Sequence, residues 1–347
     1  MQKESLFGKT LKELEIIAAD NGLQRFAARQ ISDWLYKKHV SHIDEMSNLS
    51  IAFRKTLNEK FSVGRTKHVK VQVSTDGTKK YLYPVLNQKF IEAAYIPESD
   101  RATLCVSSQV GCKMGCLFCM TGKQGFQGQL TSLDILNQVA SLPEFDKLSN
   151  IVYMGMGEPF DNLDAVLKSL EILTSDYGYG WSPKRITVST IGIIPGMKRF
   201  LNESKCHLAV SLHSPFDDER KKLMPIQVIY PAKEVLSEIR GFDFGLQRRV
   251  SFEYIMFKGI NDTPRHVNEL VKILTGIKCR INLIRFHPIP GTPLESSDNN
   301  TIESFKTALN SKGIVTTLRQ SRGQDILAAC GLLSTKESEA TLIHKAE

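Results

Sequence analysis

Seven short apolar segments alternate with helix-like segments between residues 101 and 318. The expected strands are residues 103–107, 151–154, 186–190, 208–212, 250–256, 281–286 and 314–318. Between them, Thr131 and Asp161 are each followed three residues later by an aspartate, a pattern typical of helix starts. Repeated strand–helix units form a parallel sheet covered by helices. About six units are too few to close an eight-stranded barrel, so the sequence predicts an α/β fold with an open, partial (β/α)6 barrel whose chemistry lies at the carboxyl ends of the strands.

The first 97 residues have a different character. Residues 9–20, 27–38 and 50–61 carry apolar side chains at helical spacing, which predicts three helices. Residues 66–97 contain alternating apolar and polar side chains around an Asp76-Gly77 turn, which predicts a hairpin followed by another strand.

Positive charge is concentrated near the N-terminus. The formal net charge is +8, and residues 1–70 hold 13 Lys or Arg against 8 Asp or Glu. A concentrated basic excess favours a polyanionic partner such as RNA. We expect four parts: a helical accessory domain that binds RNA (1–65), a small β extension (66–97), a catalytic core (98–333) and a tail (334–347).

Composition indicates a cytoplasmic protein with no membrane partner. The sequence has no run of about 18 apolar residues, which a membrane-spanning helix would need. Its N-terminus also lacks an apolar signal segment. The chain has seven cysteines, and an odd number in a reducing compartment indicates metal or redox chemistry rather than a disulfide scaffold.

Three of these cysteines form a compact C-x3-C-x2-C motif. They are Cys112, Cys116 and Cys119, and Phe118 precedes the last of them. A structural zinc site would close with a fourth Cys or His at short spacing, and none is present here. A four-iron cluster needs one ligand for each iron, so three thiolates leave one iron open. The motif resembles the cluster loop of the radical S-adenosylmethionine (SAM) superfamily, in which the open iron binds SAM.

Further candidate residues follow the predicted strands. The run Met154-Gly155-Met156-Gly157-Glu158-Pro159 follows the second strand, and its glycines let the backbone approach a ligand closely. Glu158 could accept hydrogen bonds from an ammonium group. Ser189 lies at the end of the third strand, and Ser211-Leu212-His213 lies at the end of the fourth. The expected position of these groups at one edge of the sheet favours ligand contacts.

The motifs together resemble one narrower family. They are the segment from Thr103 to Cys112, the run from Met154 to Pro159, Ser211-Leu212-His213, and the segment from Arg322 to Leu332. This combination is similar to the RlmN family of dual-specificity radical SAM enzymes, which methylate C2 of adenine in rRNA. The resemblance covers the chain to about residue 333 and implies a partial barrel of the radical SAM type.

The resemblance also implies a role for individual residues. Cys112, Cys116 and Cys119 would bind one [4Fe-4S] cluster. Glu92 would be the proton acceptor, Cys330 the methylated cysteine and Cys105 its resolving partner. The residues expected to contact SAM are Gly157, Glu158, Ser189, Ser211, Leu212, His213 and His287. His287 departs from the family pattern, which has asparagine there, and its charge depends on pH.

The family's reaction passes the methyl group through the protein. A first SAM methylates the Cys330 thiolate, and a second SAM yields a 5′-deoxyadenosyl radical that takes a hydrogen from this methyl group. The resulting methylene radical adds to adenine C2, Glu92 removes the C2 proton, and Cys105 attacks the sulfur of Cys330 to release the product. Such radical chemistry belongs to cofactors. The implied partners of the monomeric enzyme are 23S rRNA, tRNA as a second candidate substrate, and a low-potential electron donor.

Two alternatives stay open at this point. An enzyme of the same fold that methylates C8 of the same adenine, and so confers antibiotic resistance, shares these motifs. A non-catalytic RNA-binding protein with a structural metal site is the alternative from another class.

Other conspicuous residues have simpler interpretations. The basic runs Arg248-Arg249 and Arg220-Lys221-Lys222 are candidate contacts for RNA phosphates. Cys206, Cys279, Trp34 and Trp181 are expected to be packing residues.

Overall fold

The computed structural model describes residues 3–85, 88–245 and 250–335. Its main feature is a ten-stranded sheet with the strand order β14-β13-β12-β11-β10-β9-β6-β5-β4-β3. Seven strands are parallel: β6 (Ala102–Cys105), β9 (Asn150–Tyr153), β10 (Ile186–Thr190), β11 (His207–Ser211), β12 (Val250–Met256), β13 (Cys279–Arg285) and β14 (Val315–Leu318). All seven predicted strands are present within two residues of their expected bounds.

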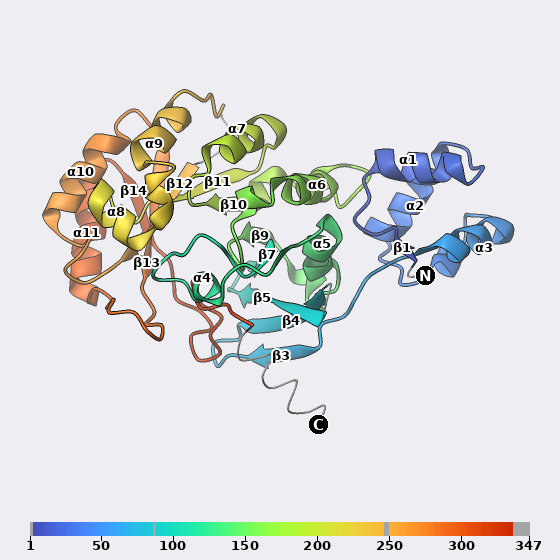
Figure 1. Ribbon diagram of the computed structural model, residues 1–347, viewed down its shortest axis with the longest axis horizontal. Helices are drawn as coiled ribbons and strands as arrows, with labels where there is room; N and C mark the ends of the chain where they lie inside the picture. The colour runs from blue at the N-terminus through green and yellow to red at the C-terminus, as the bar shows by residue number, and fades with distance from the viewer. Residues whose placement is uncertain (1–2, 86–87, 246–249, 336–347) are drawn as a thin grey trace.

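Helices connect the parallel strands and cover one face of the sheet (Figure 1). Neighbouring helices contact one another in the order α5, α6, α7, α9, α10, α11, which makes a continuous outer layer. Their bounds are α5 (Ser132–Ala140), α6 (Leu163–Thr174), α7 (Ile194–Glu203), α9 (Ala232–Arg240), α10 (Pro264–Leu274) and α11 (Asn299–Ser311). A shorter helix, α8 (Asp217–Leu223), follows β11. The sheet runs from β14 to β3 without closing, so the predicted open, partial barrel is confirmed.

The predicted β extension continues this same sheet. Its strands are β3 (Lys70–Val73), β4 (Lys79–Val85) and β5 (Lys89–Pro97). Each is antiparallel to its neighbour, and β5 is also antiparallel to β6. The expected turn at Asp76-Gly77 joins β3 to β4, and Gly77 adopts a φ of +85°, which glycine tolerates at low cost. The extension therefore enlarges the sheet of the barrel, and some of its side chains point into the barrel interior.

Strand register divides the sheet into an apolar face and a polar face. Residues that oppose each other across a strand pair share a face, as do residues two apart along a strand. On the helix-covered face, Leu104, Ile151, Val188 and Leu208 are fully buried in the main hydrophobic core. The opposite face, which lines the barrel interior, carries in sheet order Lys80, Glu92, Cys105, Ser189, Ser211, Glu253 and Asn282.

Two short elements shape the barrel interior. Strands β7 (Gln109–Val110) and β8 (Gly128–Gln129) form a small antiparallel pair. The loop between them contains α4 (Met120–Gln124) and lies beside the segment that follows β14.

The N-terminal region forms a helical module next to α5 and α6 (Figure 1). It contains α1 (Leu11–Asp20), α2 (Phe26–Tyr36) and α3 (Ile51–Lys60), and all three expected helices are present. Strands β1 (Glu4–Ser5) and β2 (Phe61–Ser62) pair in parallel and bring its two ends together. Ion pairs from Lys168 to Glu13 (2.6 Å) and from Arg29 to Asp176 (2.7 Å) connect the module to the barrel.

Within the described ranges, no helix has both the length and the apolar character needed to cross a bilayer.

Candidate active site

The cysteines expected to bind the cluster share the loop between β7 and α4: Cys112, Cys116 and Cys119. Gly111 starts this loop with a φ of +70°, and a Cβ there would lie 1.7 Å from the carbonyl oxygen of Gly125. Only glycine fits such a position. The N–H of Leu117 donates to the carbonyl of Leu223 at 2.9 Å, which fixes the loop to the end of α8.

The surroundings of the three thiols fit an iron–sulfur cluster. Burial raises the pKa of the Cys112 thiol to about 12, and it also raises the pKa values of Cys116 and Cys119. Buried thiols of this kind ionise when a bound cation compensates the charge. The charge of Cys119 contributes to the raised pKa of both Cys112 and Cys116, so the three thiols are neighbours. In a four-iron cluster each thiolate binds a different iron, so three neighbouring thiols suit a cluster with one open iron.

The glycine-rich run after β9 lies against the start of this loop. Gly157 has a φ of +97°, and a Cβ there would lie 2.5 Å from the Cβ of Gln109. The carboxylate of Glu158 accepts the backbone N–H groups of Phe160 and Ile191, both at 3.0 Å. Burial raises the pKa of Glu158 to about 7. The backbone thus holds this carboxylate in a fixed orientation inside the barrel.

The other expected SAM contacts lie at the ends of β10 and β11. Ser189 and Ser211 are both half-buried on the polar face. Leu212 is buried, and its N–H donates to the carbonyl of Glu253 at 3.0 Å. The strand ends therefore bring these residues together, as the parallel fold requires.

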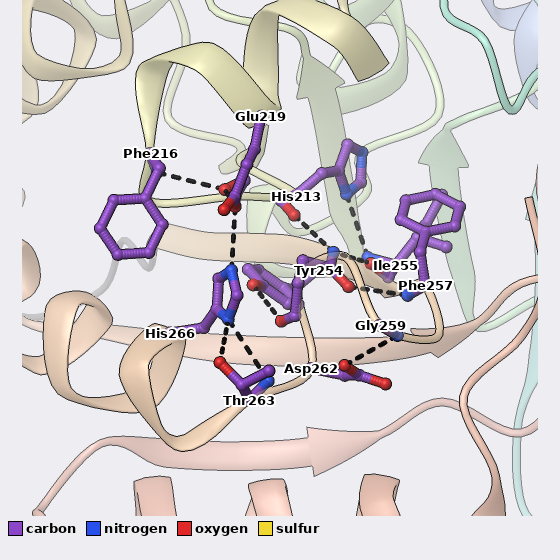
Figure 2. Close-up of polar contacts among 12 residues, drawn as sticks. His213, Phe216, Glu219, Tyr254, Ile255, Phe257, Gly259, Asp262, Thr263 and His266 are labelled. Atoms are coloured by element: carbon purple, nitrogen blue, oxygen red, sulfur yellow. Dashed lines mark hydrogen bonds and ion pairs between the residues drawn. The ribbon is translucent and has the colours of Figure 1, made fainter.

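His213 is held in an unusual backbone conformation, and its side chain contacts Ile255 (Figure 2). Its φ is +58°, and its Nδ1 accepts the N–H of Ile255 at 3.0 Å. The amide of Asn261 donates to the carbonyl of His213 at 2.6 Å. The imidazole also packs edge-on against Phe118, with 4.7 Å between ring centroids. Burial lowers the pKa of His213 to about 3, so the ring is neutral and its Nε2 carries the proton.

The prediction that Arg220 contacts RNA is wrong. Its side chain is 1 % exposed, and its guanidinium donates to the carbonyls of Ile191 (2.8 Å), Ser211 (3.2 Å) and Leu212 (3.2 Å). These are carbonyls at the ends of β10 and β11, so Arg220 fixes the strand ends that carry the expected SAM contacts. Lys221 and Lys222 are exposed, and Arg248 and Arg249 lie outside the described residues.

His287, which stands where the family has asparagine, is buried in the loop after β13. Its Nδ1 contacts the side-chain amide of Gln324, which belongs to the segment leading to Cys330. Burial lowers the pKa of His287, and the nearby charge of Arg285 acts in the same direction. The ring is therefore a neutral hydrogen-bonding group, which reduces the pH dependence expected from the sequence.

Glu92 lies on β5 and points into the interior as part of a buried ion pair. Its Oε1 lies 3.1 Å from the Nζ of Lys80, and its Oε2 accepts the N–H of Ser334 at 3.0 Å. Ser334 follows Cys330 by four residues. The tail segment thus connects the expected methyl carrier to the expected proton acceptor.

Cys105 and Cys330 come together although 224 residues separate them in the sequence. Both thiols are free. Burial raises the pKa of Cys105 to about 12, and the neighbouring Cys330 adds to this effect. Cys330 packs in the same apolar cluster as Cys112 and Cys119, and the N–H of Met120 donates to the carbonyl of Gly331 at 2.8 Å. The fold therefore places Cys330 between the cluster loop and Cys105.

Sequence reasoning missed three charged residues of this interior. Arg319, just after β14, lies 3.6 Å from Glu253 and 3.2 Å from the sulfur of Met154. Interaction with Cys330, followed by Glu253 and Cys105, raises the pKa of Arg319. Lys80 is the third. For Arg319 the available signal was position, because it follows a predicted strand like the other site residues. Lys80 stands next to Lys79 at the start of its strand, and nothing in the sequence distinguishes the two lysines.

The residues expected to pack do so. Cys206 is buried in the main core, and Cys279 packs against it. Trp34 and Trp181 also pack against this core.

Comparisons with known proteins identify the family of the chain. Residues 106–271 match the model of the radical SAM superfamily, and residues 5–63 match the model "Ribosomal RNA large subunit methyltransferase N-terminal domain". A probable dual-specificity RNA methyltransferase RlmN from Parabacteroides distasonis is 57% identical over 338 residues, which are 97% of this chain and 98% of the relative. The dual-specificity RNA methyltransferase RlmN from Syntrophus aciditrophicus is 40% identical over 346 residues, 99% of each chain.

A solved structure supports the same assignment. The crystal structure of a radical SAM methyltransferase from Sphaerobacter thermophilus has a TM-score of 0.89 and 38% identity, and the match covers 95% of this chain and 99% of that one. The radical SAM superfamily uses a [4Fe-4S] cluster and SAM, as the cysteine motif predicted. These matches exclude the alternative of a non-catalytic metal-binding protein. The chain belongs to the RlmN family of dual-specificity RNA methyltransferases within the radical SAM superfamily.

Proposed function

We propose that this protein methylates C2 of an adenine in 23S rRNA and carries the transferred carbon on Cys330. The observation that carries the proposal is the convergence of Cys330, Cys105 and Glu92 beside the cluster loop. Glu92 and Cys105 lie on the neighbouring strands β5 and β6, whereas Cys330 comes from the far end of the chain. Their proximity gives a carrier, a resolving thiol and a base at one place. The family name and the rRNA methyltransferase description of the N-terminal match favour the same reaction.

The cofactor residues would be Cys112, Cys116 and Cys119 for the cluster, with SAM held by the strand-end set Gly157, Glu158, Ser189, Ser211, Leu212, His213 and His287. When bound, this cofactor pair supplies the radical chemistry that an electron-poor ring carbon requires. Neutral His213 offers one N–H donor, and the fixed carboxylate of Glu158 offers acceptors for an ammonium group. The buried apolar residues around the loop exclude water from the reacting atoms.

The protein's own residues perform the transfer steps. The sulfur of Cys330 takes a methyl group and later presents its carbon to adenine C2. Glu92 accepts the C2 proton. The thiolate of Cys105 then attacks the sulfur of Cys330, and a disulfide forms. The bond between that sulfur and the transferred carbon breaks with its electron pair left on the carbon, which takes up a proton to become the methyl group. The unpaired electron that remains from the radical addition would return to the cluster. Arg319 lies near both thiols, and its charge opposes the burial that raises the pKa of Cys105.

The wider setting completes the proposal. Residues 1–65 serve as an accessory RNA-binding domain, residues 66–97 as a β extension, and residues 98–333 as the catalytic core. The enzyme acts as a cytoplasmic monomer that takes electrons from a low-potential donor. A tRNA with an accessible adenine is a second candidate substrate.

Nucleoside analysis tests the proposal. The cluster-loaded enzyme is incubated anaerobically with SAM, a chemical reductant and either 23S rRNA or tRNA, and the RNA is digested to nucleosides. Mass spectrometry with authentic standards then separates 2-methyladenosine from 8-methyladenosine. We expect 2-methyladenosine from rRNA, and the tRNA reaction decides whether tRNA is a second substrate. Formation of 8-methyladenosine alone would instead support the C8 alternative and contradict the proposal.

A further inference from the structure

A lysine and a carboxylate meet inside the barrel on two antiparallel strands. Lys80 of β4 opposes Ala94, and Glu92 of β5 opposes Leu82, so the two charged side chains are diagonal neighbours on one face. The Nζ of Lys80 lies 3.1 Å from Oε1 of Glu92. The exposed fractions of the two side chains are 8% and 2%. The pair is therefore shielded from solvent in the same interior that contains Cys105.

A buried ion pair of this kind contributes little net stability to a fold. Removing two charges from water costs several kcal/mol for each ion, and their attraction often only repays this cost. An apolar pair of similar volume would stabilise the same strands at least as well. The position of the pair is informative because Glu92 is the residue that would accept the adenine proton, and its second oxygen already binds the tail next to Cys330.

The charge state of Glu92 decides whether it can act as a base. A buried carboxylate without a nearby cation takes up a proton, because burial disfavours the charged form. A protonated carboxyl group cannot accept another proton from C2. An adjacent ammonium group reverses this preference and keeps the carboxylate ionised.

We propose that Lys80 is a positioning residue for the deprotonation of adenine C2, holding the Glu92 carboxylate ionised and directed at the substrate; this inference rests on the proposed function. In this step the C2–H bond breaks, its electron pair stays on the adenine ring, and the proton moves to Glu92. Lys80 forms no bond to substrate. Once Glu92 is neutral, the same ammonium favours loss of the new proton and so restores the base for the next turnover.

The neighbouring lysine provides a matched control. Lys79 is adjacent in the chain but points to the opposite face, where its Nζ binds Glu144 at 2.6 Å. Both lysines belong to the same strand and each pairs with one carboxylate. Lys80 is the more buried of the two lysines, so the stability of each variant is measured by unfolding alongside its activity. An effect on the base should appear as a changed isotope effect and a trapped adduct, and it should be confined to Lys80→Met.

The test compares wild type, Lys79→Met, Lys80→Met and Lys80→Arg as cluster-loaded enzymes acting on rRNA with hydrogen or deuterium at adenine C2. For Lys80→Met we expect RNA methylation to fall about 100-fold, the scale of a general base contribution. The hydrogen isotope effect should increase, and a covalent adduct between Cys330 and RNA should accumulate. Methylation of Cys330 by SAM precedes this step and should stay at the wild-type rate. Lys80→Arg should recover part of the activity, and Lys79→Met should match wild type.

The outcomes separate the two proposals. A wild-type enzyme that yields no 2-methyladenosine contradicts the proposed function itself. If wild type is active, a Lys80→Met enzyme with the wild-type rate and isotope effect overturns the role of Lys80. So does a loss that Lys79→Met shares, or one that already appears in the methylation of Cys330. If Lys80→Met does not fold, Lys80→Gln carries the test, because its amide can still donate to Glu92 without the charge; a wild-type isotope effect in that variant also overturns the proposal.

Discussion

The two halves of the catalytic interior are built in different ways. The radical-generating half, comprising residues 112–119 and 154–159 with the ends of β10 and β11, comes from short motifs at strand ends. The methyl-transfer half, comprising Lys80, Glu92, Cys105, Arg319 and Cys330, comes from single residues spread across the chain. Backbone groups and glycines shape the first half, whereas sheet register and a tail segment assemble the second. A substitution in one half should therefore impair the function of that half and leave the function of the other half intact.

The largest expected effect separates the halves directly. Cys330→Ala should retain the cluster and SAM binding but lose RNA methylation by at least about 1,000-fold, because the carrier sulfur is absent. Cys116→Ala should lose the cluster itself, since one of three protein ligands is missing. Iron and sulfide analysis, SAM binding and nucleoside analysis distinguish the two variants. Retained methylation in Cys330→Ala would remove this residue from the mechanism.

A smaller effect is expected within the methyl-transfer half. Arg319 opposes the burial that raises the pKa of Cys105, so Arg319→Met should raise that pKa further. Each unit of increase reduces the thiolate fraction about tenfold at a given pH. Product release should therefore slow about tenfold and recover as the pH rises. Arg322→Met is the control from the same segment, and equal release rates in the two variants at every pH would contradict this role.

Stability should respond most strongly in the radical-generating half. Arg220→Met removes the donors for several buried carbonyls at the strand ends, and we expect the free energy of unfolding to fall by about 3 kcal/mol or more. Exposed Lys221→Met should change it by no more than about 0.5 kcal/mol. Denaturant unfolding of both variants under anaerobic conditions gives the comparison. Similar stabilities would show that Arg220 does not hold the strand ends together.

The pH dependence of stability provides a finer test of the same half. The pKa of His213 is lowered to about 3 in the folded protein, whereas an unfolded histidine titrates near about 6.5. The unfolded state therefore binds the additional proton as the pH falls from about 6.5 towards 3, and the stability present above this range is lost. Between pH 7 and pH 5 this linkage amounts to about 2 kcal/mol. His213→Gln should lack that part of the pH dependence in unfolding measurements, and an identical dependence in wild type and variant would argue against a buried neutral ring.

The same contrast explains what the sequence could predict. Strand and helix periodicity located all seven parallel strands, and three closely spaced cysteines identified the cluster loop, because these signals are local. Arg220 was misplaced because a charged run indicates a solvated surface, and its burial depends on carbonyls from two strands that meet only in the fold. Lys80 and Arg319 were missed for the same reason. Their importance arises from partners 12 and 66 residues away, and no spacing rule in a single sequence reveals such pairs.

In the proposed reaction the methyl group rests on Cys330 before it reaches RNA. The cluster-loaded enzyme, first freed of any methyl group, is incubated with SAM and rRNA in the absence of any reductant, and both the protein peptides and the RNA nucleosides are analysed by mass spectrometry. We expect one methyl group on the peptide that contains Cys330 and no methylated adenosine, since the later steps need an electron. Methylated adenosine without reductant, or an unmodified Cys330 peptide, would contradict it.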